Sequence, residues 1–544
     1  MVYVNQYPLV LGRWEDQTTF PMMLSRAGPR PSFELYQAGE IGGDHYALLS
    51  MGYYTADLLG WSLVTLRLPA IVGGLAALAT FFGLTARWYG FWPALFTAFA
   101  LGFNPTFFMF SHQLIVPIIS MLFLLLVIER YQLIEQGRHL RWTVPTLALA
   151  FTLLLEQYAV GRVYGCAMVV YWMAWLIGSS IRARRKGVPV DRKAWLAFPA
   201  FVALVVVFSV VLDPSNARQL TLQLLFPPDG EYVVVSAEQL ALVRDNLAVE
   251  LNAIVPLLTV APGRLGQFSS DLVVDVRTYV LPMSMVPLVV LGAAVVLAQL
   301  RRRSSARLSV FLLVVLFAGP LLSANVGGHL SISSFRMFYL LIPLYLLAAA
   351  AMARLIHHRE RAMQLAACGV MLLVLTAQVA SAVREIDRHN VFLEDLARRW
   401  QPSSPLTLFR DNGAQRATPQ FELATNGSYQ YYFLQLAPLA AAVRILDRAP
   451  IGATDADVVV VRLLGPVQSG KSGGATRVVF YLRSFGASAA LFDPMDQSVR
   501  GAGVIPFAPP AYVVADGPGS AATAVSLLRQ AGRQVRVVDF EWSS

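Results

Sequence analysis

Long apolar runs recur along the chain, and they limit its fold more than any other feature. A helix needs about 20 apolar residues to cross a hydrocarbon core roughly 30 Å thick. The mean hydropathy is +0.55, far above that of an ordinary soluble protein. We therefore expect a polytopic α-helical membrane protein. The predicted spans are 62–86, 91–111, 113–132, 142–158, 160–182, 194–212, 279–300, 307–324, 337–356 and 363–381.

Two apolar stretches, 91–132 and 142–182, are each too long for a single crossing. Each would measure about 60 Å as one continuous helix, which is twice the membrane thickness. Both stretches must therefore fold back. The sequence indicates the breaks at Asn104-Pro105 and in the segment 156–162.

The composition excludes several function classes. Of the 544 residues 56% are hydrophobic and only 14% are charged, with a formal charge of +10. Many of the arginines lie in short segments between apolar runs, which is typical of topology determinants and argues against a nucleic-acid partner. The two cysteines, Cys166 and Cys368, each fall inside a predicted span, so neither a disulfide framework nor a zinc site is expected. We interpret both as small core residues.

Arginine and lysine fall on alternate loops, and this pattern predicts the orientation. Basic residues gather in 130–141, 182–193, 301–307 and 354–361, which are therefore predicted to be cytoplasmic. The loop 213–278, residues 1–61 and everything after about 385 are then expected outside. An exported amino terminus without a preceding span is unusual, so we expect a further transmembrane helix upstream of the recorded start.

The last part of the chain changes character, and we expect three regions in all. Residues 1–61 form a first outer loop, 62–384 a transmembrane domain, and 385–544 a soluble α/β domain on the outer face. In the last region strands are predicted at 457–464, 476–482 and 511–515, followed by a helix and a strand within 521–539.

Ionisable or polar side chains interrupt the apolar runs at their predicted outer ends. Such groups are costly near the membrane and are functional candidates for that reason. Arg67 is a candidate for binding phosphate, with a snorkelling side chain as the alternative. His112 is a candidate hydrogen-bond donor to phosphate, although a lone histidine is more often structural. The other members of the set are Glu156, Tyr158, Arg162, Asp213 and Arg336.

An acidic pair, Glu15-Asp16, lies in the predicted first outer loop. One of these carboxylates could serve as the general base for an acceptor hydroxyl, or the pair could help to bind a divalent cation. The alternative is a solvated pair that caps a juxtamembrane helix, because such caps are common. One acidic pair has too few ligands to specify a metal site, so the metal remains unknown.

The segment 465–472, GPVQSGKS, matches the spelling of a phosphate-binding P-loop. A P-loop needs a helix directly after the glycine-rich turn, and the next segment, 476–482, is rich in residues typical of strands. The domain is also predicted to face away from cytoplasmic ATP. We therefore interpret the segment as a hairpin loop.

Several motifs together resemble the GT-C membrane glycosyltransferases related to protein O-mannosyltransferases and aminoarabinose transferases. The resemblance covers about residues 5 to 380 and rests on the order and spacing of the motifs. They are the acidic pair, Gly43 to Leu49, Thr65-Leu66-Arg67-Leu68-Pro69-Ala70, Asn104-Pro105 with Ser111-His112-Gln113, Tyr158 to Tyr164, and Phe335-Arg336-Met337 leading to Ile342-Pro343.

The resemblance implies a bacterial inner-membrane transferase that moves a sugar from a polyprenyl-phosphate carrier to an acceptor on the outer face. It implies Glu15 or Asp16 as the general base or as the acid that orients the acceptor. It also implies Arg67, Arg162 and Arg336 as candidates for contacts to the carrier phosphate or to the acidic pair. The resemblance does not identify the sugar, and the acceptor could be protein, lipid or glycan.

The chain also departs from the family pattern. His112 stands where many relatives have an arginine, and the residues at 115–117 provide no acid. A non-catalytic scaffold that binds envelope proteins through residues 385–544 is therefore the main alternative, and it predicts that Glu15 and Asp16 are dispensable. A transporter is disfavoured, because paired half-repeats are not evident and the charges lie at the outer ends of the spans.

Overall fold

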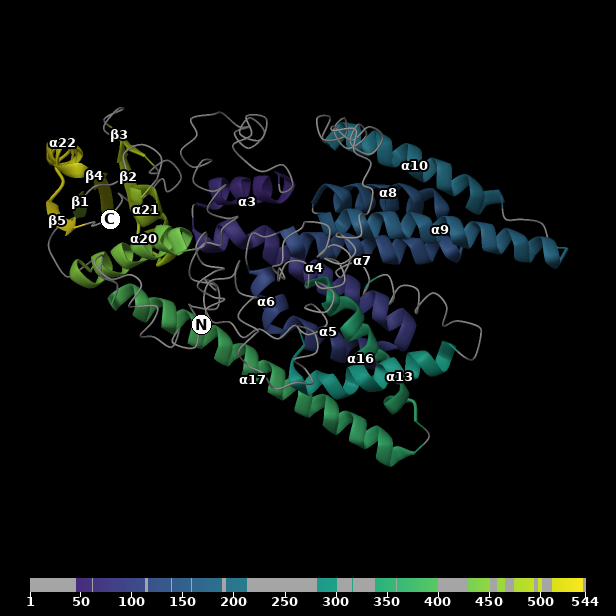
Figure 1. Ribbon diagram of the computed structural model, residues 1–544. Helices are drawn as coiled ribbons and strands as arrows, with labels where there is room; N and C mark the ends of the chain where they lie inside the picture. The colour runs from purple at the N-terminus through teal and green to yellow at the C-terminus, as the bar shows by residue number, and fades with distance from the viewer. Residues whose placement is uncertain are drawn as a thin grey trace, which may run out of the picture.

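Helices that pack side by side make up most of the computed structural model, with a small sheet at one end of the bundle (Figure 1). The structure describes residues 46–60, 62–112, 116–137, 139–157, 159–187, 192–212, 281–300, 316, 338–358, 360–399, 429–450, 457–464, 474–493, 498–500 and 511–541. The predicted span 307–324 and the loop 213–278 lie outside these residues, apart from position 316.

The described helices follow the predicted spans closely. The bundle contains α3 (Tyr46–Leu59), α4 (Leu63–Tyr89), α5 (Phe91–Gly102), α6 (Pro105–Ser111), α7 (Val116–Glu135), α8 (Leu140–Gln157), α9 (Ala159–Arg185), α10 (Arg192–Leu212), η5 (Met283–Met285), α13 (Val286–Leu300), η6 (Phe338–Leu340), α16 (Leu341–Ile356) and α17 (Arg361–Arg399). Among the described residues, three stretches are long and apolar enough to cross a membrane: Leu63–Tyr89, Phe338–Ile356 and Arg361–Arg384. Their composition supports an integral membrane protein.

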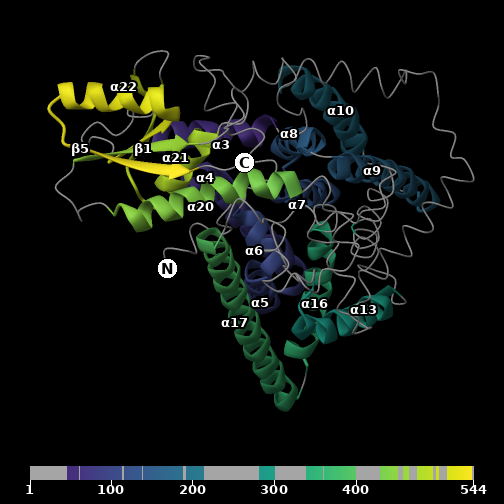
Figure 2. The ribbon, with the colours of Figure 1, turned by 60° about the vertical axis from the view of Figure 1, so that its left-hand side comes forward.

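Two details of the span predictions are corrected. Helix α17 was expected to end at 381 but continues to Arg399, a length of about 58 Å. It therefore crosses the expected domain boundary at 384 and reaches α20 (Tyr429–Arg448), on which it packs (Figure 2). Cys368 was expected in the core and is instead exposed on α17.

The predicted break at Asn104-Pro105 is confirmed, and a buried polar network holds it. The Asn104 side-chain oxygen accepts a hydrogen bond from the Phe107 backbone amide at 3.1 Å, which caps α6. Its side-chain nitrogen donates to the Tyr345 hydroxyl on α16 at 3.2 Å, and Gln378 on α17 donates to the same hydroxyl at 3.4 Å. The network joins three elements that are far apart in sequence, so the break is fixed by tertiary contacts as well as by proline.

The described residues after the bundle form a five-stranded sheet in the order β3-β2-β4-β1-β5. The strands are β1 (Val458–Leu464), β2 (Ala489–Asp493), β3 (Ser498–Arg500), β4 (Tyr512–Asp516) and β5 (Val535–Glu541), and all pairs are parallel except β2 with β3. The helices that accompany them are α20 (Tyr429–Arg448), α21 (Gly474–Ser484) and α22 (Gly517–Gln530). The strand predictions at 457–464 and 511–515, and the helix and strand within 521–539, are confirmed.

The strand predicted at 476–482 is wrong, because these residues lie in helix α21. Five successive side chains from Val478 to Leu482 are almost fully buried. The helix packs against α20, against strands β2 and β4, and against α4, so tertiary burial overrides the strand propensity of the segment. This result removes one of the two arguments against a P-loop at 465–472. The loop itself lies outside the described residues.

Candidate functional site

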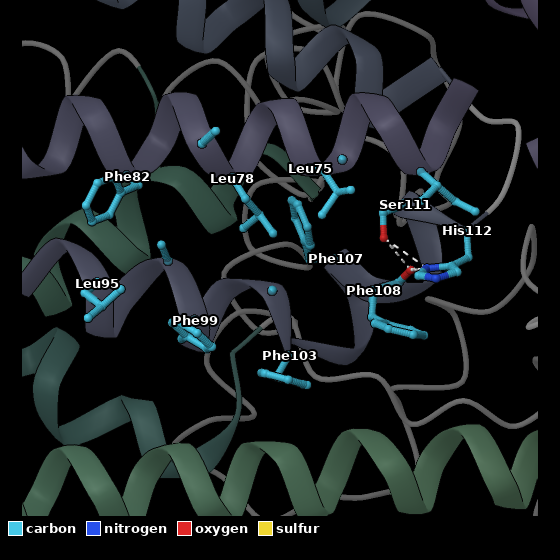
Figure 3. Close-up of a pocket in the computed structure, with 15 residues that line it drawn as sticks. Leu75, Leu78, Phe82, Leu95, Phe99, Phe103, Phe107, Phe108, Ser111 and His112 are labelled. Carbon is cyan, nitrogen blue, oxygen red and sulfur yellow. Dashed lines mark hydrogen bonds between the residues drawn. The ribbon is translucent and has the colours of Figure 1, made fainter. Parts of the chain in front are cut away.

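A cavity of about 470 Å³ lies between α4, α5 and α6, and it is almost entirely apolar (Figure 3). Ser111 and His112 provide the polar side chains of its lining, and both lie at one end. The opposite end is formed by Phe82 on α4 and Leu95 on α5. A long cavity with one polar end fits a molecule that has an apolar tail and a polar head.

The cavity opens on the surface of the bundle. Leu75 and Phe99 both line it and remain 63% and 53% exposed. They belong to α4, which is long and apolar enough to cross a membrane, and to α5, a shorter apolar helix. An apolar chain could therefore enter from the surrounding lipid without passing through water.

Backbone contact between α4 and the short helix α6 sets the width of the polar end. A Cβ atom on Gly74 would lie 2.6 Å from the Ser111 Cβ, which is closer than real Cβ atoms approach. Small residues allow such close approach between membrane helices. Gly74 was not identified from the sequence, although the pair Gly73-Gly74 in an apolar helix was an available signal.

The hydrogen bonds of His112 define which of its ring nitrogens is available. The Nδ1 atom lies 2.8 Å from the Phe108 carbonyl oxygen, and the Ser111 hydroxyl lies 3.2 Å from the same nitrogen. A carbonyl can only accept, so Nδ1 carries the proton and donates to Phe108. The ring also stacks on Phe108 with 4.1 Å between centroids. Neutral His112 therefore presents Nε2 as an acceptor, and it needs a second proton to donate to an anion.

The charge state of His112 depends on its surroundings at the end of α6, between two predicted spans. Burial lowers the pKa of the His112 imidazole below its usual value, the hydrogen bond to Phe108 raises it, and the nearby positive charge of Arg67 lowers it. The electrostatic effect of Arg67 places the guanidinium in the vicinity of this ring. The two residues that the sequence predicted separately therefore lie near one another.

Arg67 on α4 is only 1% exposed, one helical turn before Ile71 of the cavity lining. A snorkelling side chain would extend its head group to the surface, so that alternative is wrong. A buried guanidinium is costly unless hydrogen-bonding or charged groups compensate it. The arrangement combines a buried cation, a histidine and the apolar cavity, which we call the groove.

Most other candidate residues lie outside the described part of the chain, namely Glu15, Asp16, Tyr158, Asp213 and Arg336. Arg162 and Glu156 belong to α9 and α8, but their side chains are not described. Within the described residues, no group of three or more His, Cys, Asp or Glu could hold a metal ion. A divalent cation at the acidic pair stays a prediction.

Comparisons with known proteins find similarity in three-dimensional structure. No protein-family model matches the chain, and no curated protein matches it in sequence. Two solved structures of ArnT from Cupriavidus metallidurans are similar to it. The structure bound to undecaprenyl phosphate has a TM-score of 0.43 and 15% identity over 97% of this chain and 88% of that chain. The apo structure has a TM-score of 0.40 and 17% identity over 96% and 90%. ArnT is a GT-C aminoarabinose transferase.

Proposed function

We propose that the protein is a glycosyltransferase that moves a sugar from a polyprenyl-phosphate carrier to an acceptor on the outer face of the membrane. The observation that carries the proposal is the apolar groove with Ser111 and His112 at its end and the buried Arg67 nearby. A polyprenyl phosphate has the same distribution of polarity, with a long hydrocarbon tail and a single anionic head.

The groove accounts for the position of the carrier. Its apolar part would hold the isoprene units nearest the phosphate, while the rest of the tail stays in the lipid. The phosphate would then lie near Arg67, where a guanidinium can donate two hydrogen bonds to its oxygens. This placement would hold the sugar beyond the groove, where an acceptor can approach.

The proposed reaction exchanges one bond for another at the anomeric carbon of the sugar. The bond from this carbon to the phosphate oxygen breaks, and a bond to the acceptor oxygen forms. Glu15 or Asp16 would take the proton from the attacking hydroxyl. Arg67, together with Arg162 and Arg336, would stabilise the negative charge that develops on the departing phosphate. The products are the glycosylated acceptor and free polyprenyl phosphate.

The test uses purified full-length protein in lipid nanodiscs with undecaprenyl phosphate carriers that bear different labelled sugars. Incubation with an envelope extract as acceptor should move label out of the carrier and release undecaprenyl phosphate. If the label stays on the carrier for every sugar, the scaffold is the better interpretation. Nanodiscs that contain no protein, incubated in the same way, provide the background.

Filling the groove is expected to weaken use of the carrier without disturbing the fold. Ala98 lines the cavity, and Ala98→Trp would place a large ring where isoprene units are proposed to lie. Loss of about two buried CH₂ groups predicts an increase of about tenfold in the KM for the carrier. Steady-state transfer at varied carrier concentration measures this value.

The matched control for Ala98→Trp is Val72→Trp. Val72 lies on the same bundle, is 57% exposed and does not line the cavity, so the same ring should leave the KM unchanged. Equal effects of the two substitutions would contradict the groove as the carrier site.

Binding of the carrier phosphate is expected to strengthen as pH falls. The pKa of His112 is lowered in the free protein, and a bound anion would raise it, so binding takes up a proton. The Kd for undecaprenyl phosphate should decrease as pH drops through the His112 pKa of the complex. Comparison of wild type with His112→Gln between about pH 5 and 8 separates this effect from ionisation of the phosphate itself. If the Kd of His112→Gln changed with pH in the same way as the Kd of wild type, His112 would be remote from the head group.

A further inference from the structure

The C-terminal part of the chain covers the amino end of α4, the helix that carries Arg67. The Leu63 backbone amide donates a hydrogen bond to the Ser484 side-chain oxygen at 3.3 Å, across 421 positions of sequence. Leu63 is fully buried and Ser484 is 3% exposed. The first amides of a helix have no acceptor within the helix, so Ser484 satisfies one of them.

The next part of this helix end is held by its own residues. The Ser62 side chain accepts a hydrogen bond from the Thr65 amide at 3.2 Å, and the Thr65 side chain accepts one from the Ser62 amide at 3.0 Å. This reciprocal pair is a capping box. The first turn of α4 is therefore fixed by a local cap at Thr65 and by a residue of the C-terminal domain at Leu63.

Arg67 follows Leu63 by four positions, which places the two on the same face of α4. Both are buried, as is Leu66 between them. A displacement of the helix end at Leu63 would therefore move the Arg67 backbone, and the side chain has little space in which to compensate. Ser484 can therefore influence the guanidinium through the position of the helix end.

Ser484 is itself firmly placed. It is the last residue of α21, and its hydroxyl donates to the Phe480 carbonyl oxygen at 2.9 Å while it accepts from Leu63. Helix α21 packs on α20, which in turn packs on the long α17 of the bundle (Figure 2). The Tyr512 hydroxyl donates to the Ala449 carbonyl oxygen at 2.6 Å and ties the sheet to the end of α20. The C-terminal domain thus contacts the bundle at α17 and at α4.

We infer that the C-terminal domain positions Arg67 for the carrier phosphate through the hydrogen bond between Ser484 and Leu63. Ser484 is a positioning residue, and the domain is part of the transfer machinery. This inference rests on the proposed function, because it assigns the carrier phosphate to Arg67.

The test compares Ser484→Thr with Ser484→Val. These side chains have nearly the same volume and differ in a hydroxyl against a methyl group. Ser484→Val should raise the KM for the sugar-charged carrier about fivefold relative to Ser484→Thr, the ratio that corresponds to loss of one helix-capping bond. Ser484→Ala adds no volume and should resemble Ser484→Val, which covers the case in which the larger side chains disturb folding.

Thr523→Val is the matched control, because it makes the same chemical change on the exposed helix α22. The Thr523 hydroxyl donates to the Gly519 carbonyl oxygen within its own helix. This variant should keep the wild-type KM. A general loss of stability in the C-terminal domain would affect both sites, whereas a positioning role affects only Ser484.

Binding of undecaprenyl phosphate in the Arg67→Gln background decides whether Ser484 acts through Arg67. There, Ser484→Val should not change the Kd further, while in the wild-type background it should raise the Kd about fivefold. Full additivity of the two changes, or equal KM values for Ser484→Thr and Ser484→Val, would overturn the inference. A different outcome separates the two proposals. If Ser484→Val raised the Kd for undecaprenyl phosphate but the wild-type protein transferred no sugar, the inference would be supported and the proposed transfer reaction would be contradicted.

Discussion

Sugar transfer is expected to fall by about 10²- to 10³-fold when Arg67 is replaced by glutamine, with most of the loss in kcat. The guanidinium is buried near His112 and the polar end of the groove, where a charge acts more strongly than it does in water. Glutamine keeps part of the length and polarity but cannot balance the negative charge of the departing phosphate. Initial rates with a saturating, labelled carrier measure the effect.

Arg87→Gln is the control for this substitution, since Arg87 lies near the other end of α4. Its guanidinium is partly exposed and forms an ion pair with Glu129 at 2.7 Å. Exposed ion pairs contribute at most about 1 kcal/mol, so this variant should retain both fold and transfer. Arg67→Lys should be more active than Arg67→Gln, because lysine keeps the positive charge but cannot form the bidentate hydrogen bonds of a guanidinium. If Arg67→Gln kept wild-type rates, Arg67 would have no role in the chemistry.

Simultaneous replacement of the acidic pair, Glu15→Gln with Asp16→Asn, is expected to abolish measurable transfer. A positioned general base contributes about 10² to 10⁴ in rate, and the amides cannot accept the proton of the acceptor hydroxyl. The substitutions keep the size and hydrogen-bonding capacity of both side chains. The measurement is loss of label from the carrier over a long incubation at high protein concentration.

Carrier binding distinguishes catalysis from assembly in this double variant. The Kd for undecaprenyl phosphate should stay close to wild type, because the phosphate is assigned to Arg67 and not to the acids. Retained transfer would show that Glu15 and Asp16 are dispensable, which is what the scaffold hypothesis predicts. The single variants then show which acid carries the reaction.

The positions of the helices followed closely from the sequence, because hydropathy is a local property. Predicted spans 62–86, 142–158 and 194–212 agree with α4, α8 and α10 to within a few residues. Helix α17 was predicted too short, since its last turns carry charged residues that no hydropathy window recognises as a span. Those turns continue the helix toward α20, on which α17 packs.

The candidate site, too, could be predicted from the sequence only in part. Arg67 and His112 could be singled out individually, because ionisable residues beside apolar runs are rare and costly. Their proximity, the groove beside them and the role of Gly74 could not be predicted. These features depend on how closely α4 and α6 approach, which is a property of packing between segments about 40 residues apart.

The sequence by itself determined the membrane-spanning character of the chain, the break at Asn104-Pro105 and most strands of the C-terminal sheet, since each follows from local hydropathy, proline geometry or strand propensity. Only the tertiary structure decided that 476–482 is helical, because burial against α4, α20 and the sheet outweighs the intrinsic preference of that segment. The same packing brings Ser484 to the amino end of α4. A contact across 421 positions leaves no local trace in the sequence.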